Sequence, residues 1–278
     1  MTRRHFPRLL VLLAAAPLLL FAEDDRPVID DSQVKKEVPA SALPTLWIAG
    51  DSTVKNQGNM RGWGQDIASL VDTTKIQVVN RAIGGRSSRT FFSEGRWDDM
   101  LKTMKSGDIV LIQFGHNDAG PLDERGKFRG SVKGTGDETE QVKKPDGSTE
   151  AVHSYGWYLK HFARTAKAKG ATVVLCSPIP HKKFDREGKF VGDWDEWRGW
   201  VRNCATAEGV LYLDLSGLIG SRYAAMEKNE IEALFTDART HTNAEGAKLN
   251  AQVVIEGLKA LPGNPLEKYL PKAAATPP

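Results

Sequence analysis

The sequence predicts an α/β protein: a three-layer α/β/α sandwich around a five-stranded parallel sheet. Two observations lead to it. Five short apolar runs, most of them rich in Val, Ile and Leu, have the composition of strands buried on both faces. Amphipathic stretches of helical length separate them. The expected strands are 45–49, 76–80, 108–114, 171–177 and 210–215, and the expected helices are 62–71, 96–105, 155–169, 194–207, 216–228 and 244–261.

Length and composition fit one globular domain. The chain has 278 residues, of which 40% are hydrophobic and 26% charged, enough for a substantial core. We assign the domain to residues 45–262, because Pro262-Gly263 closes the last helix. Residues 23–44 are polar and contain prolines, as in a linker or N-terminal extension, and residues 263–278 are expected to be a frayed tail.

The first 22 residues have the order of a secretory signal peptide. Arg3, Arg4 and Arg8 precede an apolar stretch over 9–21, and Ala22 precedes an acidic run. The alternative is an uncleaved anchor. A signal peptide predicts an exported protein, periplasmic or extracellular, with no membrane partner after its removal.

Charge argues against a nucleic-acid partner. The whole chain has 38 Lys and Arg against 35 Asp and Glu, but the first 22 residues hold three arginines and no acid. The remainder is therefore balanced at 35 of each, without the basic excess that nucleic acid requires.

The two cysteines, Cys176 and Cys204, lie in no zinc-binding motif. In an exported protein they can pair. Because Cys176 falls in an apolar strand and Cys204 in a helical pattern, we favour two buried thiols.

Residues 119–152, between the third and fourth strands, form an unusually long insertion. The segment is rich in Gly, Lys, Asp and Glu and has no clear period. A connection of this length is either functional or disordered. It leaves from the carboxyl end of the third strand, where ligands gather in open α/β sheets.

The most informative motif is Gly50-Asp51-Ser52-Thr53, directly after the first strand. Such a turn presents a serine hydroxyl at the carboxyl edge of the sheet. The tetrapeptide alone also describes an ordinary capped turn. A catalytic serine needs a histidine as base and donors for a developing oxyanion.

Three later motifs supply such partners. Gly84-Gly85 follows the second strand and lets a backbone N–H approach a ligand closely. Asn117, after the third strand, carries a side-chain amide that can donate to the same oxyanion. His241, four residues after Asp237, precedes the last helix and can accept the serine proton. Each motif alone also fits a plain turn or loop.

Together these motifs resemble the SGNH, or GDSL, hydrolase superfamily, and within it the rhamnogalacturonan acetylesterase group. The resemblance implies a flavodoxin-like sandwich with Ser52 as nucleophile and His241 as general base. It also implies an oxyanion hole made by the Ser52 and Gly85 N–H groups and the Asn117 side chain. The family usually places its aspartate three residues before the histidine, where this chain has Ala238. Either Asp237 still reaches His241, or a backbone carbonyl orients the imidazole.

The resemblance implies an exported serine esterase that needs no cofactor or metal and removes O-acetyl groups from a plant cell-wall polysaccharide, with pectic rhamnogalacturonan as the leading candidate. The alternatives are a lipase or thioesterase of the same superfamily, and a carbohydrate-binding relative with impaired catalysis. The sequence leaves the oligomeric state open. The candidate substrate-binding residues are Arg86, His116, Asp118 and Trp157, of which Arg86 is a candidate for pairing with uronate carboxylates.

Overall fold

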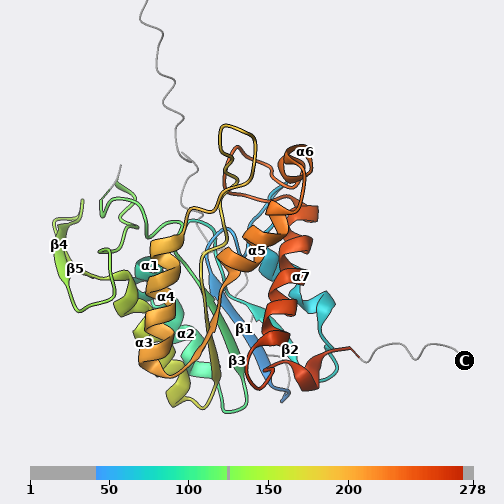
Figure 1. Cartoon of the computed structure of the whole chain (residues 1–278). Coiled ribbons are helices and arrows are strands. Elements are labelled where there is room, and N and C mark those ends of the chain that lie inside the picture. Colours follow the sequence, from blue (N-terminus) through green and yellow to red (C-terminus); the bar gives the residue numbers. More distant parts are fainter. Residues whose placement is uncertain (1–41, 124–125, 272–278) are drawn as a thin grey trace, which may run out of the picture.

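The computed structural model describes residues 42–123 and 126–271. The expected signal peptide, residues 23–41 and residues 272–278 lie outside these ranges. The central sheet has five parallel strands in the order β2-β1-β3-β6-β7, which is the flavodoxin-like order (Figure 1). The strands are β1 (Thr45–Gly50), β2 (Gln77–Asn80), β3 (Ile109–Gln113), β6 (Thr172–Cys176) and β7 (Leu211–Leu213).

Helices cover both faces of the sheet, as the alternating pattern predicted (Figure 1). One face carries α1 (Ser88–Ser93), α2 (Arg96–Thr103), α3 (Tyr155–Ala168) and α4 (Asp195–Glu208). The other carries the short 3₁₀ helices η1 (Trp63–Gln65) and η2 (Ile67–Leu70) together with α5 (Leu215–Ala224), α6 (Lys228–Glu232) and α7 (Ala244–Ala260).

The two cores follow from the alternation of side chains along each strand. On β1, Leu46 and Ile48 pack into the core under α5 and α7, while Trp47 and Ala49 pack into the core under α1 to α4. All four are fully buried. Strands buried on both faces explain why the sequence shows continuous apolar runs there.

Several expected elements differ in the structure. The stretch 62–71 forms two 3₁₀ helices instead of one α-helix, and 216–228 is divided between α5 and α6. Helix α1 was not expected. Its N-cap is Ser87, whose hydroxyl accepts the N–H of Thr90. At six residues the helix is too short to give a helical period in the sequence.

The long insertion contains an antiparallel hairpin, β4 (Thr139–Lys143) paired with β5 (Thr149–His153), which projects beside α3 (Figure 1). Most of its residues are exposed, so apolar patterning gives little sign of it.

The expectation of a frayed tail from residue 263 is wrong for 263–271. These residues form η4 (Glu267–Tyr269), and Leu266 is fully buried in the core under α7. The two cysteines are free and buried, as favoured from sequence. Burial raises the pKa of the Cys176 thiol to about 12 and that of Cys204 to about 11.

Candidate active site

Ser52 lies in a tight turn at the carboxyl end of β1. The turn requires Gly50, because a Cβ there would lie 2.5 Å from Val54 Cγ2 and 2.7 Å from the Gln113 carbonyl oxygen. Asp51 shapes the turn, since its Oδ1 accepts both the N–H and the hydroxyl of Thr53 at 2.8 and 2.7 Å. Asp51 and Thr53 are buried, whereas Ser52 is half-buried. The turn thus presents the serine from a rigid base.

Ser52, a histidine and a carboxylate are joined by two successive hydrogen-bond contacts. Ser52 Oγ lies 2.8 Å from His241 Nε2, and His241 Nδ1 lies 2.5 Å from Asp237 Oδ2. A carboxylate only accepts hydrogen bonds, so Nδ1 carries the hydrogen. Nε2 is then left to accept from the serine hydroxyl. This is the order that general-base activation of a serine requires.

The loop before α7 brings Asp237 to His241 despite the extra residue between them. Asp237 Oδ1 accepts the N–H groups of Arg239, Thr240 and His241 at 2.9, 2.6 and 3.1 Å. These bonds wrap the backbone around one carboxylate oxygen and leave the other for the imidazole. The carboxylate, and not a backbone carbonyl, therefore faces Nδ1.

The same contacts set the ionisation of Asp237. Partial burial acts to raise its pKa, but the hydrogen bonds from His241 and from the three main-chain N–H groups outweigh burial. The pKa of Asp237 therefore lies far below its ordinary value, and the group is a carboxylate at neutral pH.

Of the three expected oxyanion donors, Gly85 follows β2 and Asn117 follows β3. Gly85 has a φ of 77°, in the left-handed region that favours glycine, while Gly84 does not. Asn117 Nδ2 donates to the Arg86 carbonyl oxygen at 2.9 Å. An amide carries two hydrogens, so this bond fixes its orientation and leaves the second to donate elsewhere.

Two candidate substrate-binding residues are engaged inside the protein. Arg86 is 4% exposed, and its Nε lies 3.1 Å from Glu94 Oε2. Asp118 is fully buried, and its carboxylate accepts hydrogen bonds from the hydroxyls of Ser88 and Ser131. Burial raises the pKa of Asp118 to about 6, against the lowering effect of those bonds. Both side chains are held by contacts within the fold.

The other two candidates are also engaged by protein groups. His116 Nδ1 lies 3.3 Å from Asp51 Oδ2, and its Nε2 lies 3.1 Å from the Ile179 carbonyl oxygen. Trp157, on α3, stacks with the imidazoles of His153 and His161, with ring centroids 3.7 and 5.4 Å away.

This chain is similar to known proteins over most of its length. Residues 48–249 match the model of the GDSL-like Lipase/Acylhydrolase family, and this span includes Ser52, Gly85, Asn117 and His241. The chain belongs to this family. It is therefore a hydrolase of carboxylic esters.

Among the relatives of this acylhydrolase is a rhamnogalacturonan acetylesterase of Emericella nidulans, 32% identical over 80% of this chain and 87% of the relative. The protein named "Probable rhamnogalacturonan acetylesterase YesY" of Bacillus subtilis is 32% identical over 82% of this chain and 97% of its own length. The crystal structure of Bacillus subtilis YxiM matches with a TM-score of 0.63 and 26% identity, over 78% of this chain and 56% of that one.

Two residues of this acylhydrolase that touch the site were not found from sequence. Lys182, in the loop after β6, donates its N–H to the Arg239 carbonyl oxygen at 2.7 Å and its ammonium to the Asp237 carbonyl oxygen at 3.0 Å. Arg129, in the insertion, lies beside Gly85. Both come from irregular segments, where no period or motif marks a basic residue as different from a solvated one.

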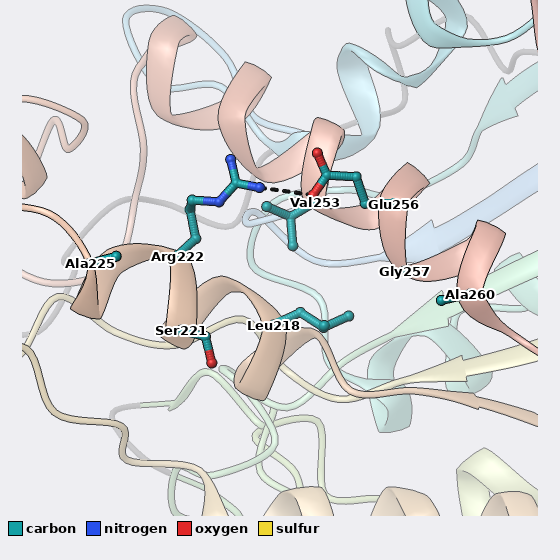
Figure 2. A pocket seen from close by; sticks show the side chains of 8 residues that line it. All are labelled: Leu218, Ser221, Arg222, Ala225, Val253, Glu256, Gly257 and Ala260. Atoms are coloured by element: carbon teal, nitrogen blue, oxygen red, sulfur yellow. Dashed lines mark hydrogen bonds and ion pairs between the residues drawn. The ribbon is translucent and has the colours of Figure 1, made fainter.

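A depression of about 340 Å³ between α5 and α7 lies apart from these residues (Figure 2). Its lining includes Leu218 and Val253, and the Arg222–Glu256 ion pair crosses it at 2.8 Å. None of the groups around Ser52 lines it, so we do not connect it with the chemistry.

In residues 42–123 and 126–271, no helix is long and apolar enough to cross a membrane. In the same ranges, no cluster of three or more His, Cys, Asp or Glu side chains is placed to hold a metal ion.

Proposed function

We propose that this acylhydrolase is an exported serine acetylesterase that removes O-acetyl groups from pectic rhamnogalacturonan. The observation that carries the chemistry is the continuous contact from Ser52 Oγ through His241 to Asp237, at 2.8 and 2.5 Å. The substrate class is supported by the two relatives named as rhamnogalacturonan acetylesterases. A polymeric substrate of plant cell walls agrees with the expected signal peptide.

Acylation begins when His241 Nε2 takes the Ser52 proton and Oγ attacks the acetyl carbonyl carbon. The resulting oxyanion accepts hydrogen bonds from the N–H groups of Ser52 and Gly85 and from Asn117 Nδ2. His241 then returns the proton to the sugar oxygen as the C–O bond breaks. The sugar hydroxyl leaves, and the acetyl group stays on Ser52.

Deacylation repeats the steps with water. His241 takes a proton from water, the hydroxide attacks the acetyl-serine carbonyl, and the same donors hold the second oxyanion. Protonated His241 gives its hydrogen to Ser52 Oγ as the bond from Oγ to the acetyl carbon breaks, and acetic acid leaves and loses its proton to water. Asp237 keeps the hydrogen of the neutral imidazole on Nδ1 and stabilises the imidazolium formed in each half.

The test compares wild type with Ser52→Ala on a small aryl acetate, acetylated rhamnogalacturonan, acetylated xylan and a long-chain acyl ester. We expect acetate release from rhamnogalacturonan to be fastest among the polymers and to disappear in Ser52→Ala. Preference for the long-chain ester would support the lipase alternative. Absence of hydrolysis on every ester, with retained polysaccharide binding, would support a carbohydrate-binding relative.

A further inference from the structure

The guanidinium of Arg129 lies beside the proposed oxyanion hole. A methyl group added to the Cα of Gly85 would lie 3.6 Å from Arg129 Nη1, which is ordinary contact distance. Arg129 belongs to the insertion between β3 and α3, whereas Gly85 follows β2. The insertion therefore places a positive charge where the ester of a substrate would be held.

The segment directly after Arg129 is fixed to the body of the protein. Arg89 Nη1 donates to the Gly130 carbonyl oxygen at 2.8 Å, and the Ser131 N–H donates to the Asp118 carbonyl oxygen at 3.1 Å. The Ser131 hydroxyl adds a bond of 2.6 Å to the buried Asp118 carboxylate. Asp118 directly follows Asn117 in the sequence. These bonds therefore anchor the segment of Arg129 close to Asn117 as well as to Gly85. A loop that is already ordered favours ligand binding, because little conformational entropy is lost when the ligand binds.

The backbone before Arg129 is held in an unfavourable conformation. Phe128 has a φ of 48°, in the left-handed region that bulky residues rarely adopt. Strain of this kind persists where the surrounding structure imposes it, and it is frequent at functional sites. Here it precedes the residue that reaches Gly85.

Two further arginines, Arg86 and Arg89, follow Gly85 closely in the sequence. Arg86 pairs with Glu94, and Arg89 pairs with Glu150 of the hairpin at 2.8 Å. Both arginines are almost completely buried. The uronate-binding role considered for Arg86 from sequence fits Arg129 better, because Arg129 is only partly buried and its Nη1 lies beside Gly85.

We propose that Arg129 is a specificity-determining residue that binds a uronate carboxylate of the substrate while the neighbouring acetyl group occupies the oxyanion hole. This inference rests on the proposed function. A guanidinium is always charged and offers paired N–H donors that match a carboxylate. Rhamnogalacturonan carries carboxylates along its backbone, whereas acetylated xylooligosaccharides without uronate branches are neutral. Arg129 would thus favour the anionic polymer.

The experiment removes the positive charge of Arg129 by substitution, or the negative charge of the substrate by methyl esterification. Wild type and Arg129→Gln are assayed on acetylated rhamnogalacturonan, on the same polymer with its carboxylates methyl-esterified, and on 4-nitrophenyl acetate. Lys133→Gln is the matched control, because it removes an equal charge from an exposed residue of the same insertion. Arg129→Lys tests whether charge without the paired donors is sufficient.

We expect Arg129→Gln to lower kcat/KM on the carboxylate polymer about 10- to 50-fold, the range of a charge-assisted hydrogen bond. Its activity on the methyl-esterified polymer and on the aryl acetate stays within about twofold of wild type, as does Lys133→Gln on all three. Arg129→Lys recovers part of the loss. Methyl esterification lowers wild-type activity by a similar factor and leaves Arg129→Gln unaffected.

Two results would overturn the inference. Equal losses on all three substrates would place Arg129 in support of the oxyanion hole or the loop, and no loss on the carboxylate polymer would remove it from the site. Wild type that cleaves none of the three would instead overturn the proposed function, and this inference with it. Binding to acetylated uronate oligomers in the Ser52→Ala background gives a second readout, which Arg129→Gln should weaken by the same factor.

Discussion

The two halves of the proposed catalytic site, the turn with Ser52 and the loop with Asp237 and His241, are held in different ways. The turn carrying Ser52 belongs to the core: Thr53 accepts from Gln113 Nε2 at 2.8 Å, and Gln113 Oε1 accepts from the Trp63 indole N–H at 2.8 Å. These three side chains are at most 2% exposed. Ser52, the proposed nucleophile, is thus positioned by the sheet and by a buried hydrogen-bond network.

The loop carrying Asp237 and His241 is positioned mainly by main-chain bonds near the surface. The Thr236 N–H donates to the His241 carbonyl oxygen at 2.8 Å, and Lys182 donates twice to the outer part of the loop. The side chain of Asp237 is 34% exposed. Changes beneath Ser52 should therefore lower stability, whereas changes around the His241 loop should lower activity with little effect on folding.

The largest effect is expected at the base. His241→Ala removes the proposed acceptor of the Ser52 proton, and it should lower kcat about 10⁴-fold or more. Steady-state hydrolysis of 4-nitrophenyl acetate measures this, with circular dichroism to check that the variant is folded. A loss below about tenfold would show that another group acts as the base.

Asp237→Ala should cost less than His241→Ala, about 10²- to 10³-fold in kcat, because the imidazole remains and only its orientation and charge stabilisation are lost. The same assay checks it, with Asp237→Asn as a variant that keeps the shape. Equal losses in Asp237→Ala and His241→Ala would show that this aspartate, despite its displaced position, is indispensable to the triad.

Beneath Ser52 the expected change is in stability. Thr53→Val keeps the shape but removes a hydroxyl that bonds to Asp51 and Gln113, and should lower the free energy of unfolding by about 2 to 3 kcal/mol. Thr53→Ser keeps the hydroxyl and is the control. Urea denaturation measures the difference. Unchanged stability in Thr53→Val would contradict the buried role assigned to the network.

At the His241 loop, Lys182→Met should lower kcat about tenfold, since misplacing a catalytic group by a fraction of an ångström has effects of this size. KM and unfolding free energy should change little. Lys182→Arg should restore part of kcat, and Lys183→Met, at an exposed neighbouring position, should match wild type. A drop in stability without a drop in kcat per folded molecule would contradict the positioning role.

Two carboxylates near the proposed site differ in the sign of their contribution to pH-dependent stability. The fully buried Asp118 has a pKa raised to about 6, so its contribution to stability is complete below about pH 4 and is lost as pH rises through 6. Asp237 has a lowered pKa, so its contribution is present above about pH 4 and is lost as pH falls.

Asp118→Asn should therefore gain about 1 kcal/mol of unfolding free energy relative to wild type between pH 4 and pH 5, because the amide does not ionise. Urea denaturation at the two pH values measures it. The same difference between variant and wild type at both values would show that Asp118 does not titrate there.

The contrast between the Ser52 turn and the His241 loop also explains which parts of the site could be predicted from sequence. The sheet and the position of Ser52 were predictable because apolar runs mark strands buried on both faces, and a polar turn after such a strand lies at a known edge. The contact of Asp237 with His241 could not be predicted, because it depends on three main-chain N–H groups that donate to one carboxylate oxygen of Asp237. Lys182 and Arg129 were missed because their roles arise from contacts between segments distant in sequence.

The most direct test of the account is covalent trapping of the nucleophile. Wild type is treated with a fluorophosphonate, and the modified residue is located by peptide mass spectrometry. We expect one label per chain, on Ser52, absent in Ser52→Ala and formed much more slowly in His241→Ala, since Ser52 depends on His241 for its reactivity. A label on another residue, or acetate release that continues undiminished after Ser52 is fully modified, would contradict it.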